Sequence, residues 1–370
     1  MRYLDYNATA PMREEVLEYM IHASAEVRNA MSLHHHGRKA RVALDVARDL
    51  LRDVLDFPKA EVVYTSGGTE ADNLAIFGFA RQARAERGCD RLALSPWEHP
   101  AVVEPMMALQ SEGFQVDLLP MQPDGRLETS KLDSVITPKT ALVAVMLAQN
   151  ETGLILDVAS IAQRCHSVGA HLHCDAVQAV GKIPVSAMAL GCDSLALSAH
   201  KFGGPRGVGA LMSLKGNRPA ALWLGGGQEE GTRSGTQPGA LILGMSKALE
   251  LSVNELPKYA ELREKHQIFE SRVVDELGLS VIGAGLGRLP NTSSLWIPSQ
   301  GGSGWVKALS DRGFALSAGA ACHAGAAQDS RIHRLTGQSN HALEMIRVSS
   351  GLATESDTLG HLADALEDLL

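Results

Sequence analysis

The feature that most constrains the fold is a regular alternation of strand and helix signals between residues 61 and 213. The expected strands cover 61–65, 91–95, 116–119, 141–148, 171–174, 194–197 and 209–213, and the expected helices cover 70–87, 101–112 and 158–168. Strands that alternate with helices predict β-α-β units and a mostly parallel, doubly wound sheet. The stretch 141–148 is continuously apolar, as expected for a parallel strand buried on both faces. We therefore expect an α/β protein.

The pattern changes after residue 239. A long helical pattern over 239–269 is followed by short expected strands at 280–282 and 292–297, and by expected helices at 305–312 and 356–370. This change predicts a smaller α+β domain, and a chain of 370 residues is long enough for two domains. We expect a large domain over 13–250 and a small domain formed by 1–12 together with 251–370.

Composition excludes several classes of protein. The chain is 45% hydrophobic and 21% charged, as in ordinary soluble proteins, and its net charge of −8 disfavours direct binding to nucleic acid. The longest apolar runs are too short to span a bilayer and the first residues contain no apolar signal region, so we expect a cytoplasmic protein that does not bind a membrane. Five cysteines without a CxxC pair fit neither a disulfide scaffold nor a zinc cage. Three consecutive histidines at 34–36 cannot all face one ion from a regular element, and we expect no metal site.

A glycine-rich segment follows the first of these strands. Ser66-Gly67-Gly68-Thr69-Glu70 opens an expected helix. Free N–H groups, the positive end of the helix dipole and a hydroxyl would together form a phosphate cradle. The segment has neither a P-loop sequence nor dinucleotide-binding spacing. The alternative is that Ser66 or Thr69 simply caps the helix, and the residues alone leave both interpretations open.

Other polar residues follow later strands. Lys201 ends an apolar run and precedes a glycine-rich turn, while His99, Asn150 and Asp175 follow three further strands. A desolvated lysine has a lowered pKa and a nucleophilic amine, as a Schiff-base lysine requires. Taken singly, these residues could be a solvated lysine, a helix-terminal histidine, a turn former and a cap. Because the carboxyl ends of parallel strands share one edge of the sheet, together they predict a cofactor pocket. A phosphate cradle, a buried carboxylate and a Schiff-base lysine suit pyridoxal 5′-phosphate.

These residues belong to motifs that occur together in a known family. The chain resembles the cysteine desulfurases of the class V aminotransferase superfamily, from Tyr3 almost to the C-terminus. The matching segments are 3–9, 66–73, 98–99, 150–153, 174–178, 198–201, 225–229, 233–236, 317–322 and 347–351. The resemblance implies the fold type I of pyridoxal phosphate enzymes, a homodimer, and conversion of L-cysteine to L-alanine. The released sulfur is expected to reach an acceptor protein, in iron–sulfur cluster assembly or another thio-cofactor synthesis.

The resemblance also implies roles for individual residues at the cofactor. Lys201 would bind the cofactor covalently and move protons, Asp175 would pair with the pyridine nitrogen, His99 would stack on the ring, and Gln178 would bind the phenolic oxygen. The residues expected to hold the phosphate are Gly68, Thr69, Ser198 and His200, with Thr236 reaching the phosphate of the neighbouring subunit.

At the substrate, Asn150 and Arg347 would hold the carboxylate, for which the planar fork of arginine is well suited. Cys322 lies in a run of small residues over 317–327, which favours a loop over a core strand. In the resembling family this cysteine attacks the substrate sulfur and becomes a persulfide. Arg347 follows it by 25 positions (347 − 322), which is similar to the long-loop class of the nitrogen-fixation and iron–sulfur-cluster type. The alternative for Cys322 is an accidental free thiol.

Two other functions remain open at this point. Another class V enzyme, such as an aminotransferase or a selenocysteine lyase, would share the cofactor residues, although an aminotransferase would not need Cys322. An inactive interaction protein with the same fold would bind no cofactor. Glu230 departs from the arginine that many relatives carry, and the sequence does not identify the sulfur acceptor.

Overall fold

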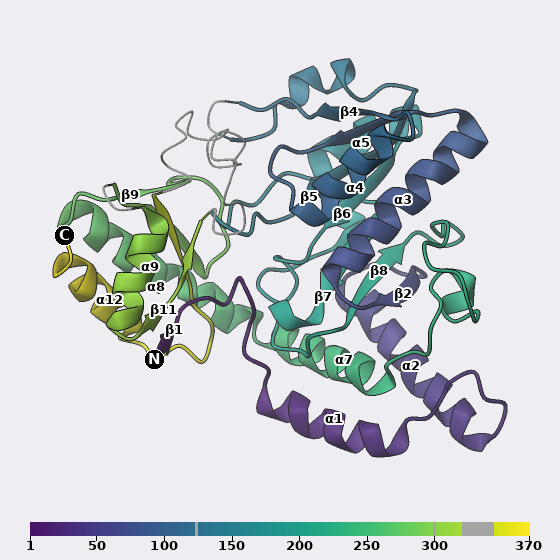
Figure 1. Ribbon diagram of the computed structural model, residues 1–370, viewed down its shortest axis with the longest axis horizontal. Coiled ribbons are helices and arrows are strands. Elements are labelled where there is room, and N and C mark those ends of the chain that lie inside the picture. Colours follow the sequence, from purple (N-terminus) through teal and green to yellow (C-terminus); the bar gives the residue numbers. More distant parts are fainter. Residues whose placement is uncertain (123–124, 299–300, 320–343) are drawn as a thin grey trace.

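The computed structural model describes residues 1–122, 125–298, 301–319 and 344–370 (Figure 1). A seven-stranded sheet has the order β2-β8-β7-β6-β5-β3-β4. Its strands are β2 (Glu61–Thr65), β3 (Arg91–Leu94), β4 (Gln115–Leu118), β5 (Thr140–Met146), β6 (His171–Asp175), β7 (Ser194–Ser198) and β8 (Gly209–Ser213). Neighbouring strands from β7 to β4 run parallel, and only β8 runs antiparallel to its neighbours β7 and β2. The predicted mostly parallel sheet is therefore confirmed.

Helices cover both faces of this sheet. The bounds are α1 (Glu14–Glu26), α2 (His35–Val54), α3 (Gly68–Arg87), α4 (Pro100–Gln110), α5 (Ala159–Val168), α6 (Ala187–Leu190) and α7 (Gly239–Asn254). Strand β5 shows how the two faces are built, because successive side chains of a strand point to opposite sides. Leu142 and Ala144 pack in one core with α3 and α4, whereas Val143 and Val145 pack in the other with α2, α5 and α7.

A second, smaller sheet lies beside the first (Figure 1). It has the order β12 (Ser317–Ala318), β13 (Met345–Ser349), β10 (Thr292–Trp296) and β9 (Ser280–Val281). Three helices, α8 (Leu256–Asp275), α9 (Gly302–Asp311) and α12 (Thr358–Glu367), share its hydrophobic core. The helical pattern over 239–269 thus forms two helices, because α8 restarts with a proline at its first turn, where the missing N–H costs nothing.

The start of the chain joins this smaller part. Strand β1 (Arg2–Tyr3) pairs in parallel with β11 (Phe314–Ala315), and Leu4 is buried in the same core as α8, α9 and α12. The expected division at 12/13 and 250/251 stays a prediction. Within the described ranges, no helix is long and apolar enough to cross a membrane. No group of three or more His, Cys, Asp or Glu side chains in those ranges is placed to hold a metal ion.

Candidate active site

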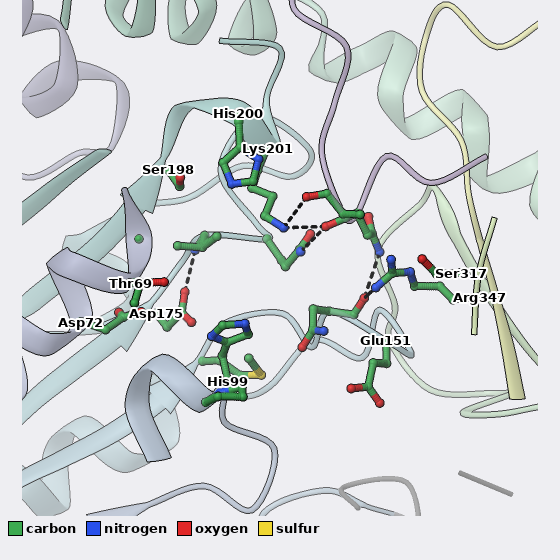
Figure 2. A pocket seen from close by; sticks show the side chains of 18 of the residues that line it. Thr69, Asp72, His99, Glu151, Asp175, Ser198, His200, Lys201, Ser317 and Arg347 are labelled. Atoms are coloured by element: carbon green, nitrogen blue, oxygen red, sulfur yellow. Dashed lines mark hydrogen bonds between the residues drawn. The ribbon is translucent and has the colours of Figure 1, made fainter. Parts of the chain in front are cut away.

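A cavity of about 370 Å³ opens at the carboxyl ends of β5, β6 and β7. Most of the predicted site residues line it, namely Gly68, Thr69, His99, Asn150, Asp175, Gln178, Ser198, His200, Lys201 and Arg347. Figure 2 shows His99, Asp175, Lys201 and Arg347 directed toward one common space from different elements. These residues therefore share one cavity at the carboxyl edge of the parallel strands, where the sequence led us to expect a pocket.

Lys201 ends a short 3₁₀ turn, Ala199–Lys201, directly after β7. Its Nζ donates hydrogen bonds to the carbonyl oxygens of Asn7, at 2.7 Å, and Ala8, at 2.9 Å. Burial, and then the nearby charge of Arg347, lower the pKa of Lys201 to about 8, and the charge of Asp175 opposes this shift. Lys201 is thus not a freely solvated surface lysine, and a large fraction of its amine is neutral at mildly alkaline pH.

Asp175 ends β6 and is 5% exposed. Its Oδ1 accepts a hydrogen bond of 2.9 Å from the backbone N–H of Val177. Burial, together with the neighbouring carboxylate of Asp72, raises the pKa of Asp175 to about 7. A positive partner inside the cavity would stabilise the ionised form of Asp175.

The N-terminus of α3 is open toward the cavity. Its N-cap residue is Gly67, and no side chain of the described residues caps it, so the capping interpretation for Ser66 and Thr69 is wrong. A Cβ atom on Gly68 would lie 2.6 Å from Cγ2 of Val177, and glycine is therefore required for this close approach. The first N–H groups of α3 remain available to an anion, as a phosphate cradle requires.

Two further predicted phosphate ligands lie near the same helix end. Ser198 is buried at the end of β7, with its Oγ 3.7 Å from where a Cβ on Gly67 would lie. The ring Nδ1 of His200 lies 3.1 Å from Oγ1 of Thr9. Burial, and then the charge of Lys201, lower the pKa of His200 to about 4, so its imidazole is neutral at neutral pH.

His99 both caps a helix and lines the cavity, the two roles that its position in the sequence suggested. It is the N-cap of α4, where its Nδ1 accepts a 3.0 Å hydrogen bond from the backbone N–H of Ala101. The same ring lines the cavity opposite Lys201 (Figure 2). The cap fixes the orientation of the ring and places its proton-bearing edge, Nε2, away from the cap.

Arg347 lies on β13 and is paired in register with Ser317 of β12. Its Nη1 donates to the carbonyl oxygen of Asn150 at 2.9 Å, and its Nη2 donates to Oδ1 of Asp5 at 2.6 Å. The Nε atom is buried without a hydrogen-bond partner in the described part of the chain. The guanidinium is thus held in one orientation at the wall of the cavity.

The sequence did not reveal two residues that organise this site. Asn7 accepts hydrogen bonds at its backbone oxygen from Lys201 Nζ and, at 2.8 Å, from Gln178 Nε2. The side-chain nitrogen of Lys182, which is 2% exposed, donates to Gln178 Oε1 at 2.6 Å and to Asn7 Oδ1 at 2.9 Å. The amide of Gln178 therefore presents its oxygen to Lys182, and its nitrogen keeps one N–H besides the one that it donates to Asn7.

One predicted residue of the described ranges, Thr236, is not brought to this cavity. Thr236 lines a separate cavity with Ser66 and Arg233 and is exposed in the single chain. Cys322 lies outside the described residues. Positions 317–319, which precede it, do line the site cavity.

The family model for class V aminotransferases matches residues 2–362. The chain belongs to the class V aminotransferase family. A "Cysteine desulfurase IscS" of Dictyoglomus turgidum is 36% identical over 378 residues, covering 100% of this chain and 94% of that protein. A "Putative cysteine desulfurase IscS 1" of Bacillus subtilis is 34% identical, with 99% of each chain covered.

Solved structures with a similar fold agree with this assignment. A protein described as "NIFS-LIKE PROTEIN" superposes with a TM-score of 0.92 at 32% identity, covering 100% of this chain and 99% of its own. A structure described as "SspA in complex with cysteine" has a TM-score of 0.79 at 29% identity, covering 94% of this chain and 98% of its own. The expected fold, fold type I of pyridoxal phosphate enzymes, is therefore confirmed for this chain.

Proposed function

We propose that this chain is a pyridoxal phosphate-dependent cysteine desulfurase that converts L-cysteine to L-alanine and retains the sulfur as a persulfide on Cys322. The observation that carries this function is one cavity in which a desolvated lysine, a buried carboxylate, an uncapped helix N-terminus and a fixed arginine converge. The curated class V relatives reported above are named cysteine desulfurases, which supports the same choice.

The residues of the cavity fit the cofactor. Gly68 is required beside the open end of α3, where the first N–H groups, Thr69, Ser198 and His200 would hold the phosphate. When bound, pyridoxal phosphate supplies an aldehyde that joins amines and a ring that accepts electrons from the substrate Cα. The Asp175 carboxylate would keep the pyridine nitrogen of the ring protonated. That positive charge would in turn stabilise ionised Asp175 and so oppose the effect of burial, which raises the pKa of Asp175.

The polar groups around the ring have complementary tasks. Gln178 would donate from Nε2 to the phenolic oxygen, since its own oxygen is occupied by Lys182. Lys201 would attach the aldehyde and then move the proton of the substrate Cα, for which an amine with a pKa of about 8 is well matched to neutral or mildly alkaline pH. His99, fixed by its cap, would stack on the ring.

Substrate binding and sulfur transfer use the wall formed by β12 and β13. Arg347 and Asn150 would hold the carboxylate of cysteine. Gly319 lines the cavity and precedes Cys322 by three positions, a separation that the backbone spans over at most about 11 Å. The Cys322 thiolate would attack the substrate sulfur, the Cβ–S bond would break, and the substrate would take up a proton at Cβ to become alanine.

The quaternary structure and the sulfur acceptor are part of the same proposal. Thr236 would complete the phosphate site of a second copy of the chain, and its exposure here supports that role. A persulfide on Cys322 would pass its outer sulfur to an acceptor protein.

The test is an assay of all products with the cofactor-loaded protein. With L-cysteine and a thiol reductant we expect equal amounts of alanine and sulfide, and no transfer of the amino group to a keto acid. Amino transfer without sulfide would favour an aminotransferase, and activity confined to selenocysteine would favour a selenocysteine lyase. A protein that stays colourless with pyridoxal phosphate would overturn the proposal.

A further inference from the structure

A continuous series of hydrogen bonds, part-buried at its outer end and buried beyond it, runs along strand β6 toward the proposed active site. Asn217 Nδ2 lies 3.3 Å from His171 Nδ1, and His171 Nε2 lies 2.8 Å from Ser194 Oγ. The same hydroxyl lies 2.8 Å from His173 Nδ1, and His173 Nε2 lies 3.1 Å from Asp72 Oδ1. Four contacts thus link a loop after β8 to α3.

The two ends of this series open into different cavities. Asn217 and His171 line a cavity of about 340 Å³, whereas Asp72 lines the proposed active site (Figure 2). His171 and Asp175 occupy the two ends of β6, and four residues of strand span about 13 Å. The middle of this hydrogen-bonded series is closed to bulk solvent, because Ser194 and His173 have no exposed surface.

Each hydrogen bond in this series is donated in the direction of Asp72. Burial lowers the pKa of His173 to about 4 and that of His171 well below its usual value, so each ring is neutral and carries one proton. The amide nitrogen of Asn217 can only donate, which makes His171 Nδ1 an acceptor and His171 Nε2 a donor. Ser194 then donates to His173 Nδ1, and His173 Nε2 donates to Asp72.

We propose that Asn217, His171, Ser194, His173 and Asp72 form a proton relay from the second cavity to the active site, and that the charge on Asp72 controls the charge on Asp175. The relay itself stands on the hydrogen bonds, and only its link to the cofactor rests on the proposed function. Asp72 lines the site and acts on Asp175, while the two histidines and Ser194 are positioning residues.

One concerted shift moves one proton through the relay. His173 gives its Nε2 proton to the Asp72 carboxylate and receives the Ser194 hydroxyl proton at Nδ1. Ser194 receives the Nε2 proton of His171, and His171 takes a proton from water of the second cavity at Nδ1. The Asn217 amide turns to present its oxygen. Asp72 becomes neutral, both rings change tautomer, and the cavity has supplied one proton.

The electrostatics of the pair explain what this proton would do. Burial, and then the charge of Glu98, raise the pKa of Asp72 well above its usual value, so Asp72 takes up a proton readily. Burial, and then the Asp72 carboxylate, raise the pKa of Asp175. A neutral Asp72 would therefore leave Asp175 with the charge that the ring nitrogen requires. The charges of Lys201 and His173 also act on Asp175. The charges of His173, Arg87 and His166 act on His171.

The test uses a variant at Asn217, the end of the relay farthest from the active site, to reverse which partner donates each hydrogen bond. In Asn217→Asp the new carboxylate can only accept, so His171 must carry its proton on Nδ1. We expect His173, two contacts further on, to change from the Nε2–H to the Nδ1–H tautomer as well. Nitrogen-15 spectra of histidine-labelled protein, recorded with and without cofactor, report both tautomers, with peaks assigned from His171→Gln and His173→Gln.

Controls separate a relay from a local effect. In the double variant Asn217→Asp, Ser194→Ala we expect His171 to respond and His173 to keep its original tautomer. Ser252→Ala removes another buried hydroxyl, which bonds within α7, and should leave both rings unchanged. If His173 does not respond to Asn217→Asp while His171 does, the relay is absent. A variant that fails to fold is replaced by Ser194→Ala alone, which must then alter the His173 tautomer equilibrium.

The link to the cofactor has its own measurement. With Asp72 held neutral in Asn217→Asp, the pH midpoint of the cofactor absorbance should fall by about one unit, because Asp175 keeps its charge to lower pH. An unchanged midpoint would overturn the control of Asp175. The tautomer spectra of cofactor-free protein do not depend on desulfurase activity, so failure of the proposed function would remain distinguishable.

Discussion

Replacement of Arg347 by lysine tests the proposed carboxylate site. The variant keeps the positive charge but loses the planar fork, whose Nη1 and Nη2 are fixed by Asn150 and Asp5. A bound carboxylate would therefore keep one charged hydrogen bond instead of two. A hydrogen bond to a charged group contributes about 1.5–3 kcal/mol, so the substrate should bind roughly 10- to 150-fold more weakly.

The assay is alanine formation by the cofactor-loaded enzyme as a function of cysteine concentration. We expect KM to rise by about one to two orders of magnitude while kcat changes by no more than about threefold, because the fork binds the ground state and the transition state alike. Arg81→Lys is the matched control, since Arg81 also uses two nitrogens to bind a carboxylate, that of Glu112, but lies outside the site. A KM that stays within about threefold of the unmodified enzyme would refute the reasoning.

Three further variants or conditions test other parts of the account. Capture of pyridoxal phosphate by the cofactor-free protein should accelerate as pH rises through about 8, where Lys201 loses its proton, and Lys201→Ala should show no visible absorbance band after dialysis. Gly68→Ala should weaken cofactor binding by at least about tenfold in an equilibrium titration, because the new methyl group would collide with Val177 beside the phosphate cradle. Burial lowers the pKa of His266 to about 3, below its unfolded value near 6.5. Below pH 6.5 the unfolded chain therefore binds a proton that the folded protein does not, and the free energy of unfolding falls by up to about 1.4 kcal/mol per pH unit. His266→Gln should reduce that slope in chemical unfolding, and an unchanged slope would contradict the assignment.

The strands and the location of the site could be predicted because both depend on local patterns. Strand β5 is apolar on both faces, and Asp175 and Lys201 each end a strand or follow one directly. Helix α2 was not predicted, although its buried positions Ala40, Leu44 and Ala47 repeat with helical spacing and offered a signal.

The organising contacts could not be predicted because they join distant parts of the chain. Asn7 meets Lys182 across 175 positions, and neither residue type suggests a partner by itself. Cys89, which follows a charged segment, is buried with its Sγ 3.6 Å from the carbonyl oxygen of Pro138, a contact that only the fold creates. The relay offered a partial signal, since His171, His173 and Asp175 alternate on one face of β6.

The most direct test of the central claim is mass spectrometry of the enzyme after one turnover with L-cysteine. The cofactor-loaded protein is treated with cysteine, alkylated without reduction, and digested. We predict one added sulfur atom on the peptide that contains Cys322, together with one alanine per active site. The buried residues Cys89, Cys165, Cys174 and Cys192 serve as internal controls and should gain none. Alanine formation without added sulfur on Cys322, or full sulfide release by Cys322→Ala, would contradict the account.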